Sequence, residues 1–466
     1  MGQLKALDGV KLEEIGTITQ VNSRNNGPAL LFDSIPGYRK GYRILTNALN
    51  NSSLLAITFG LNPSLNTEKL VEWLKGRSIM WLEKCIRYEP SYVSDGPILE
   101  NIESGADVDL TKFPVPKWHP DDAGPYIGTG CAVITKDPDN NWINLGTYRS
   151  QLFSKNEVGL YISPGKHGKI MEEKYFRSGK KMPVVLVYGM DPLTFLVSST
   201  EIPYGVSELN YIGAIRGRSV PVVKGRATNL PIPAYSEIAV EGFIEPDKMR
   251  EEGPFGEWTG YYASGQRLEP YIEVVNSYYR DEPILLGFPP SKGSYSSYGY
   301  FRSVYRSALI RNQLERLGLP GVKGVWAPEV GGSRMLLIVS IKQLYPGHAT
   351  EAALLASQLR ESAYASRFVI VVDDDINPYD IEDVLWAVCT RTNPAEDVDI
   401  IRKTWSSPLD PRIRKPTDDY TSSLAIIKAV KPYNWINEFP KTAVQNEEKR
   451  KEIFEKYKDL LHWTSW

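Results

Sequence analysis

Cysteine and histidine are scarce in this sequence, and their scarcity excludes several classes of site. The 466 residues include three cysteines, Cys85, Cys131 and Cys389. They are widely spaced and odd in number, which argues against a disulfide framework and a cysteine-based metal site and favours a reducing, cytoplasmic location. Histidine occurs four times, so each one can be weighed singly.

Long apolar runs and an excess of one charge are also missing. No stretch approaches the apolar length that spans a bilayer, and the first residues lack the apolar core of a signal peptide. The formal net charge is −2, so we expect neither a nucleic-acid partner nor a membrane partner. With 42% hydrophobic residues the chain can bury a large core, and its length suits roughly two or three domains.

Periodic patterns indicate helices in the first part of the chain and strands in the middle. Residues 66–75 predict a helix behind an Asn66 or Thr67 cap. Between about 127 and 290, short β-branched segments separated by turn signals predict a barrel or sandwich. The segments are 130–135, 183–188, 219–223, 237–242 and 269–275, with a helix near 171–178.

The last third alternates strands and helices, which predicts an α/β domain. A long amphipathic helix over 300–317 ends at Gly318 and Pro320. The following pattern predicts strand 335–341, helix 349–363, strand 368–372, helix 381–389 and a charged helix within 440–462. Such a late charged helix often packs on a neighbouring subunit.

Two polar features are assigned ordinary roles. Residues 97–120 are rich in proline and acids and predict an extended linker on the surface, with His119 as a loop histidine. Asp373, Asp374 and Asp375 follow a buried-looking strand and could bind a cation. Solvated acids that cap the next helix are the preferred interpretation.

Two acids and four aromatic residues are concentrated in Glu252-Gly-Pro-Phe-Gly-Glu257-Trp-Thr-Gly-Tyr-Tyr262. Glycine and proline oppose a helix, so this stretch predicts a tight loop that aims Glu252 and Glu257 at one place. A carboxylic acid held against aromatic rings keeps its proton to higher pH, which suits a general acid. Taken alone, the stretch is more typical of a surface turn, but motifs upstream reverse this preference.

Three segments of the strand-rich region carry oxygen and nitrogen donors: 144–149, 163–168 and 198–208. Asn144, His167 and Glu208 together would suit Mn²⁺ or Mg²⁺, with coordination positions left for phosphate oxygens. A lone histidine among strands is more often structural than a ligand. No single segment is specific.

Four motifs in order closely resemble the UbiD family of prenylated-flavin-dependent decarboxylases, over roughly residues 100 to 430. They are Asn-Leu-Gly-x-Tyr-Arg, Gly-Lys-His-Gly, Pro-x-Gly-x-x-Glu and Glu-Gly-Pro-Phe-Gly-Glu. The resemblance implies a multidomain protein of mixed α+β and α/β class. Its parts would be an N-terminal α/β region (1–102), a split β-barrel that binds prenylated FMN (103–298), a connecting helix (299–318), a C-terminal α/β oligomerisation domain (319–436) and a C-terminal helix (437–466).

The resemblance also implies the site residues. The divalent metal, Mn²⁺ or Mg²⁺, would be held by Asn144, His167 and Glu208, and K⁺ would lie near Ser198, Thr200 and the Val197 carbonyl. Cofactor contacts would come from Asn144, Thr147, Tyr148, Arg149, Ile162, Ser163, Lys166, His167, Ser198, Ser199 and Glu208. The catalytic residues would be Arg149, Glu252 and Glu257.

The implied reaction is a reversible, non-oxidative decarboxylation of an aromatic, heteroaromatic or α,β-unsaturated acid. Arg149 would grip the carboxylate, Glu252 would orient Arg149, and Glu257 would supply the proton. In some relatives a lysine near the flavin lies in the C-terminal domain, where the comparable stretch of this sequence, 420–428, has serines.

The substrate clue is the tyrosine-rich stretch 293–300, followed by Arg302, Arg306 and Arg311. It favours a substituted aromatic acid, including a CoA thioester, with Arg302 or Arg306 on a second anionic group; arginines that simply face solvent are the equal alternative.

The other functions considered are a flavin-binding subunit of a multi-component aromatic carboxylase, an ordinary FMN oxidoreductase and a non-catalytic binding protein. The expected partners are a carboxylic acid substrate, a flavin prenyltransferase that supplies the cofactor, and other copies of the chain in a homodimer or homohexamer.

Overall fold

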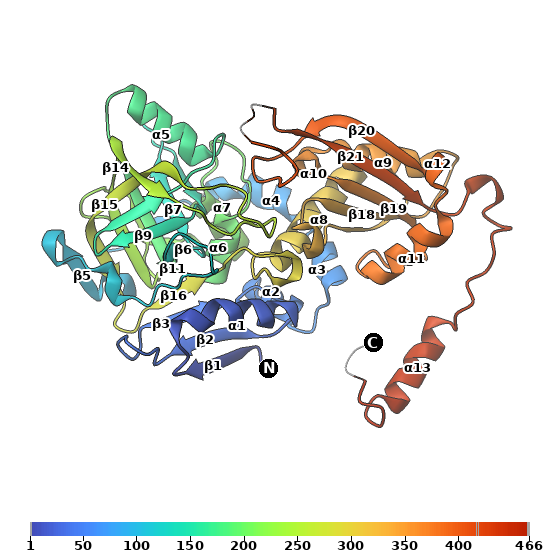
Figure 1. Cartoon of the computed structure of the whole chain (residues 1–466), viewed down its shortest axis with the longest axis horizontal. Helices are drawn as coiled ribbons and strands as arrows, with labels where there is room; N and C mark the ends of the chain where they lie inside the picture. The colour runs from blue at the N-terminus through green and yellow to red at the C-terminus, as the bar shows by residue number, and fades with distance from the viewer. Residues whose placement is uncertain (1, 416, 418, 464–466) are drawn as a thin grey trace.

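The computed structural model describes residues 2–415, 417 and 419–463. An N-terminal α/β part and a curled central sheet lie side by side, and the C-terminal α/β part lies beyond the long helix α8 (Tyr300–Arg316) (Figure 1). None of the described helices is long and apolar enough to cross a bilayer.

The N-terminal sheet recruits its last strand from far along the chain. Its strands run in the order β1 (Leu4–Asp8), β2 (Ala29–Asp33), β3 (Arg43–Thr46) and β16 (Ile284–Gly287). β16 pairs with β3 in parallel, which joins this sheet to the central region that precedes β16 in sequence. The sheet is therefore part of the same folded body as the central domain.

The N-terminal part of the chain also contains helices whose buried apolar residues lie in two cores, those of the first helix in one and those of the next three in the other. They are α1 (Leu12–Arg24), α2 (Ser52–Thr58), α3 (Thr67–Leu74) and α4 (Arg77–Lys84). The predicted cap is confirmed, because the Asn66 side chain accepts a hydrogen bond from the Lys69 N–H at 3.0 Å. α3 packs against α8, and α4 packs against α7 (Glu208–Arg216).

The central sheet is long and curled, which confirms the predicted split barrel. Its strands run in the order β6 (Tyr126–Gly128), β9 (Ser150–Ser154), β10 (Glu157–Leu160), β15 (Arg267–Tyr279), β14 (Ile238–Glu252), β11 (Met182–Gly189), β7 (Ala132–Lys136) and β8 (Ile143–Gly146), and β5 (Asn101–Ser104) pairs with β15.

Alternating side chains of the central strands face two different cores. In β11, Val184 and Leu186 lie in the core inside the curl, whereas Val185 and Val187 belong to the core that contains residues of α6 (Pro192–Ser198) and α7. A helix, α5 (His167–Arg177), follows β10 and overlaps the predicted helix.

One predicted strand belongs to a different sheet. β12 (Pro221–Lys224), near the expected strand 219–223, pairs with β13 (Pro231–Pro233) and β4 (Ser91–Tyr92) in a small sheet of its own.

The C-terminal sheet runs in the order β17 (Val322–Trp326), β18 (Leu336–Ile341), β19 (Phe368–Asp373), β21 (Thr421–Ala429) and β20 (Val398–Trp405). β18, β19 and β21 are parallel and the two outer strands are antiparallel. Helices α9 (His348–Gln358), α10 (Arg360–Ala363), α11 (Ile381–Arg391) and α12 (Pro394–Asp397) accompany it, as an α/β domain requires.

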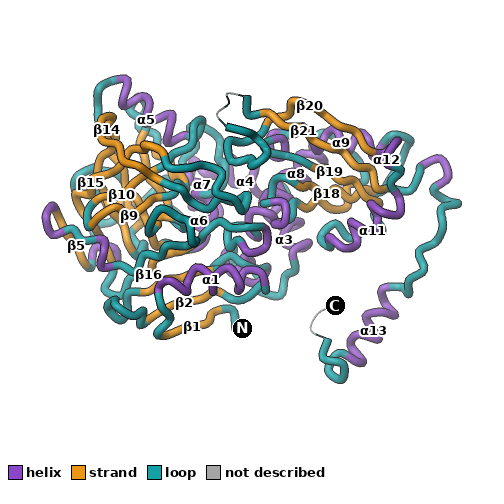
Figure 2. Tube along the Cα trace, in the orientation of Figure 1, coloured by secondary structure: helices purple, strands orange, loops and turns teal. Residues whose placement is uncertain are grey.

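The last described helix, α13 (Glu447–Tyr457), lies apart from the folded body at the end of a long loop (Figure 2). It is shorter than the predicted segment 440–462. Its packing on a neighbouring subunit stays a prediction.

Two expectations about polar segments are wrong. The segment 97–120 is not a surface linker, since it buries Val108, Leu110, Phe113, Val115 and Trp118. Its apolar residues alternate with prolines and acids, so the composition of the segment does not reveal that these residues are buried. Asp373 and Asp375 do not cap a helix either: both bind Arg391, at 2.8 and 2.7 Å, so their charges are neutralised by a cation of the chain itself.

Gly16 of α1 lies directly on the segment that carries Trp118. A Cβ atom at Gly16 would meet the Trp118 carbonyl oxygen at 2.3 Å. The Trp118 indole N–H in turn donates to the Tyr126 carbonyl at 2.9 Å. The close approach of α1 therefore depends on glycine at this position.

We expect Gly16→Ala to destabilise the protein although alanine favours helices. Overpacking costs typically about 1–3 kcal/mol, more than the roughly 1 kcal/mol that alanine gains over glycine in a helix. Urea unfolding should show a lower midpoint, whereas Thr17→Ala, at an exposed position of the same helix, should not lower it, because alanine is the better helix former. A midpoint for Gly16→Ala at or above that of the parent protein would contradict this packing.

Candidate active site

One buried arginine binds two buried carboxylates beside the curled sheet. Arg149 lies between β8 and β9, and its Nε and Nη2 donate to Oε1 and Oε2 of Glu252 at 2.8 and 2.7 Å. Its Nη1 donates to Oε1 of Glu257. The side chains are 8%, 1% and 10% exposed in that order. The structure therefore brings together the three predicted catalytic residues.

Further groups hold the ion pair in place. The Tyr126 hydroxyl donates to Oε1 of Glu252 at 2.9 Å. The Arg149 guanidinium lies 4.7 Å from the ring centre of Tyr161 and 5.3 Å from that of Phe255. Glu252 thus accepts three hydrogen bonds and is fixed, whereas Glu257 is bound to Arg149 through one guanidinium nitrogen.

Burial and charge set opposite tendencies in this cluster. Burial raises the pKa of Glu257, and the nearby Arg149 only partly offsets the effect. Burial alone would lower the pKa of Arg149, but the Glu257 and Glu252 carboxylates outweigh it and raise that pKa above its ordinary value. Arg149 is therefore always charged, and Glu257 holds a proton more readily than an exposed glutamate does.

The loop between the two acids follows directly from β14, as its glycines and proline predicted. Gly253 has a φ of 83°, a conformation that residues with a Cβ rarely adopt. The Gly256 N–H donates to Oδ1 of Asp122 at 2.9 Å, and a Cβ at Gly256 would meet Nδ1 of His119 at 2.9 Å. The loop is thus pressed against the 119–122 segment.

Sequence reasoning missed this support for the loop. His119 was expected to be an ordinary loop histidine, but its backbone N–H and its Nδ1 lie 3.0 and 3.1 Å from Oδ2 of Asp122. Its ring packs edge-on against Phe255. Asp122 is 2% exposed although its neighbour Asp121 is exposed. The signal was the pair of acids directly after His119 and Pro120.

The three predicted metal ligands lie on elements that meet beside Tyr148. Asn144 lies on β8, and Glu208 and His167 are the first residues of α7 and α5. Oε2 of Glu208 accepts from the Leu145 N–H at 2.7 Å, and the Tyr148 hydroxyl accepts from the Gly168 N–H at 3.3 Å.

The chemistry of these side chains fits a cation. Glu208 is 2% exposed, burial raises its pKa to about 8, and no basic side chain pairs with it among the described residues. A buried acid of this kind is stabilised when a cation lies beside it. In the described part of the chain no group of three acids, histidines or cysteines forms a metal site, so an amide such as that of Asn144 would have to complete this one.

The other predicted cofactor residues lie on the same segments of the chain as these ligands, or next to them in sequence. The Thr147 and Ser198 hydroxyls are 2.9 Å apart, and the Thr147 N–H donates to the Ser198 carbonyl at 2.9 Å. The Ser198, Ser199 and Thr200 hydroxyls donate to carbonyls within α6. Ile162 is buried, and the Ser163 carbonyl accepts from the Lys166 N–H.

Cations also gather between α8 and the end of α6. Nζ of Lys166 and Nη2 of Arg334 lie 3.2 and 3.6 Å from Oε1 of Glu201. Arg302 donates to the Ser199 carbonyl, and Arg306 donates to the Glu361 carbonyl at 2.6 Å. Both α8 arginines are half-buried, so the alternative that they simply face solvent is wrong.

These cations outnumber the acid among them. Burial by itself would raise the pKa of Glu201, but the cations around it, Lys166 foremost, hold that pKa well below its usual range. Burial, followed by the charges of Arg334 and Arg302, lowers the pKa of Arg306. A second anion beside Glu201 would therefore be stabilised here.

Three adjoining stretches match models of one protein family. They are the N-terminal domain (residues 11–74), the Rift-related domain (91–293) and the C-terminal domain (299–429) of 3-octaprenyl-4-hydroxybenzoate carboxy-lyase, known as UbiD. The matched stretches follow one another in the order of the family's domains and take up most of the chain.

Solved structures agree. HmfF from Pelotomaculum thermopropionicum in complex with FMN is 28% identical with a TM-score of 0.84, and 96% of each chain is covered. An evolved dimeric form of HmfF with prFMN is 27% identical with a TM-score of 0.80, covering 96% of this chain and 95% of that chain. Vanillic acid decarboxylase of Sedimentibacter hydroxybenzoicus is 28% identical with a TM-score of 0.81, covering 99% of this chain and 96% of that chain.

We expect Asp122→Asn to weaken the support of the acid-bearing loop. The amide keeps one acceptor oxygen where the carboxylate uses two, so one buried donor loses its partner at a cost of about 1–3 kcal/mol. Urea unfolding should report this loss, and Asp121→Asn is the matched control at the exposed neighbouring position. Equal stability of the two variants would show that Asp122 carries no such load.

Proposed function

The chain belongs to the UbiD family of carboxy-lyases, and from that premise we propose that it catalyses the reversible, non-oxidative decarboxylation of an aromatic carboxylic acid with prenylated FMN. The observation that carries the proposal is the buried Arg149 between Glu252 and Glu257. HmfF and vanillic acid decarboxylase, which resemble the chain over nearly its whole length, support it.

Arg149 is the residue that grips the substrate carboxylate. Glu252 occupies Nε and Nη2, so the guanidinium is oriented by a fixed partner. Of the two acids, only Glu257 contacts Nη1 of Arg149. An incoming substrate carboxylate competes with Glu257 for this nitrogen. Two like charges at one guanidinium edge repel each other, so the substrate favours the form in which Glu257 is protonated.

This exchange prepares the proton donor. Once Glu257 has left Nη1, the contact with Arg149 no longer offsets the burial that raises its pKa. The bond between the ring carbon and the carboxylate breaks, CO₂ leaves, and the electron pair stays on the carbon. Glu257 then transfers its proton to that carbon, and the reverse order carboxylates the ring. Prenylated FMN, when bound, would supply the electron sink for this electron pair.

The cofactor would be held by the residues around Tyr148. Asn144, His167 and Glu208 would bind Mn²⁺ or Mg²⁺, which would tie the flavin phosphate to the protein. K⁺ would lie near Ser198, Thr200 and the Val197 carbonyl. The remaining contacts are assigned to Thr147, Tyr148, Arg149, Ile162, Ser163, Lys166 and Ser199. The buried Glu208 without a basic partner among the described residues supports a cation at this place.

The substrate is assigned a second anionic group. The charges of Lys166, Arg334 and Arg306 act on one acid, Glu201, and the Arg334 guanidinium lies 5.9 Å from the ring of Trp258, next to Glu257 in sequence. A ring acid with a second carboxylate, a phenolate or a phosphate would therefore be neutralised here. This favours a substituted aromatic acid over a plain alkenyl acid.

A second candidate is the catalytic subunit of a multi-component carboxylase. The similar vanillic acid decarboxylase structure, ShVdcCD, contains a further component, ShVdcD. This supports the possibility that the chain works together with a second component. Activity of the purified single chain separates the two functions. A homodimer or homohexamer remains part of either proposal.

The proposal is tested by loading and turnover. The protein is produced together with a flavin prenyltransferase, the mass and visible spectrum of its flavin are recorded, and CO₂ release is measured over a panel of aromatic and cinnamate-like acids. We expect prenylated FMN and release of CO₂ from substituted aromatic acids. If the flavin-bound protein releases CO₂ from no acid, the proposed function is wrong. If it releases CO₂ only from cinnamate-like acids, the proposed substrate class is wrong.

We expect Glu257→Gln to lower kcat by roughly 10²–10⁴-fold, the usual range for a lost acid or base, with the flavin spectrum unchanged. In the parent protein the rate should fall as pH rises through the raised pKa of Glu257, because the deprotonated acid has no proton to give. Glu251→Gln, an exposed neighbour bound to Gln266, is the control. Full activity of Glu257→Gln would remove the assigned role.

A further inference from the structure

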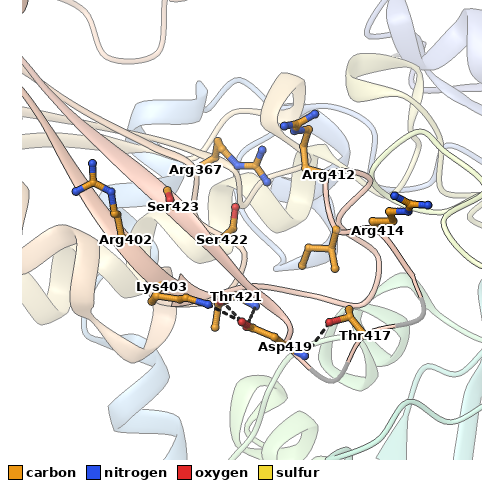
Figure 3. Close-up of a pocket in the computed structure, with 11 residues that line it drawn as sticks. Arg367, Arg402, Lys403, Arg412, Arg414, Thr417, Asp419, Thr421, Ser422 and Ser423 are labelled. Carbon is orange, nitrogen blue, oxygen red and sulfur yellow. Dashed lines mark hydrogen bonds and ion pairs between the residues drawn. The ribbon is translucent and has the colours of Figure 1, made fainter.

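A second strongly basic pocket lies in the C-terminal domain. It opens between the β20–β21 hairpin and the described residues of the loop that joins these strands, with a volume of ≈640 Å³ (Figure 3). Figure 3 shows Arg402 and Lys403 on the hairpin side and Arg412 and Arg414 on the loop side. The other lining residues are Arg367, Ile413, Thr417, Asp419, Thr421, Ser422 and Ser423. None of these residues takes part in the site described above.

Among the described residues, the acids neutralise only part of the positive charge of this pocket. Asp410 pairs with Arg367 at 2.5 Å, and Asp419 pairs with Lys403 at 2.6 Å. Among the described residues, the guanidinium groups of Arg402, Arg412 and Arg414 have neither an ion-pair partner nor a hydrogen-bond acceptor. Three arginines whose guanidinium groups have no partner among the described residues thus line one pocket, in a chain whose formal net charge is −2.

The β20–β21 hairpin is irregular beside the pocket. The pairing of β20 with β21 shifts register between Arg402 and Thr404, and Lys403 takes a φ of 60°. Such bulges redirect side chains and recur beside binding sites. Arg402 pairs across the hairpin with Ser423, so a guanidinium and a hydroxyl donor lie next to each other.

The loop that lines the pocket also contacts the segment that follows Glu257. Nζ of Lys415, on the loop that lines the pocket, donates to the carbonyl of Ala263 at 2.5 Å. Burial and the nearby Arg267 lower the pKa of Lys415, and Glu257 opposes this effect. An anion held by Arg412 and Arg414 would therefore lie on a loop that reaches the candidate active site.

We propose that this pocket binds the phosphate groups of a small molecule. Arginine presents a planar fork of donors that matches phosphate oxygens, and serine and threonine hydroxyls add further donors. The volume falls within the range of small-molecule sites, roughly 300–1,000 Å³. The concave shape and the acid Asp419 in its wall suit a compact phosphorylated ligand better than a nucleic-acid strand. This site does not rest on the proposed reaction, because binding is measured without turnover.

Isothermal titration calorimetry of the full chain with sodium pyrophosphate tests the site. We expect saturable binding that weakens with added salt and at least tenfold in the double variant Arg412→Ala/Arg414→Ala. Arg402→Gln, from the opposite wall, should weaken it as well, and circular dichroism shows whether each variant is folded. Arg177→Ala, an exposed arginine of α5, is the matched control and should bind as the parent protein does.

Two results would overturn the site: no saturable heat with the parent protein, or equal affinity in the parent and both pocket variants, which would mean an adventitious ion only. Coenzyme A, which carries a diphosphate and a further phosphate, identifies the source. If the phosphates belong to a carrier of the aromatic acid, coenzyme A displaces pyrophosphate and binds more tightly. If the source is a free phosphate, coenzyme A gives no gain over pyrophosphate; both results support the site.

Discussion

The Arg149 guanidinium and its two carboxylates are the interaction on which the rest of the site depends. A buried arginine is tolerated only when its charge is compensated, and Glu252 and Glu257 supply this compensation in unequal ways. Glu252 is held by two guanidinium nitrogens and by the Tyr126 hydroxyl, whereas Glu257 shares one nitrogen. The asymmetry separates a fixed partner of Arg149 from one with a single contact, and it supports the roles proposed for Glu252 in orienting Arg149 and for Glu257 in donating the proton.

The remainder of the fold holds this triad from several directions. Arg149 lies between β8 and β9, Glu252 ends β14, and the loop to Glu257 is pressed on Asp122. Trp118, clasped by Gly16 of the N-terminal helix, is bonded to Tyr126, which reaches Glu252. The N-terminal helix is therefore coupled to the acid in the centre through a short series of direct contacts, although the two lie far apart in sequence.

The loop that carries Glu252 and Glu257 and the curled sheet could be predicted because both are encoded locally. The place of Arg149 beside the two acids came from the family resemblance. The Gly253, Pro254 and Gly256 pattern forces a loop, and alternating β-branched residues identify strands such as β11 and β14. What failed depended on contacts distant in sequence. Composition made 97–120 look like a surface linker, since the proline and acid content conceals apolar residues that other elements bury. Asp373 and Asp375 looked free because Arg391, their partner, comes from the following helix. The roles assigned around Asn144, His167 and Glu208 came from the family resemblance and stay predictions.

The central claim is that a substrate carboxylate takes the place of Glu257 on Arg149 while Glu252 keeps its two bonds. A crystal structure of the flavin-loaded protein with an unreactive aromatic acid tests this directly. The account predicts that the ligand carboxylate lies on Nη1 of Arg149 and that the Glu257 carboxyl has moved off that nitrogen toward the ring carbon. A ligand bound elsewhere, with Glu257 still on Nη1, would contradict it.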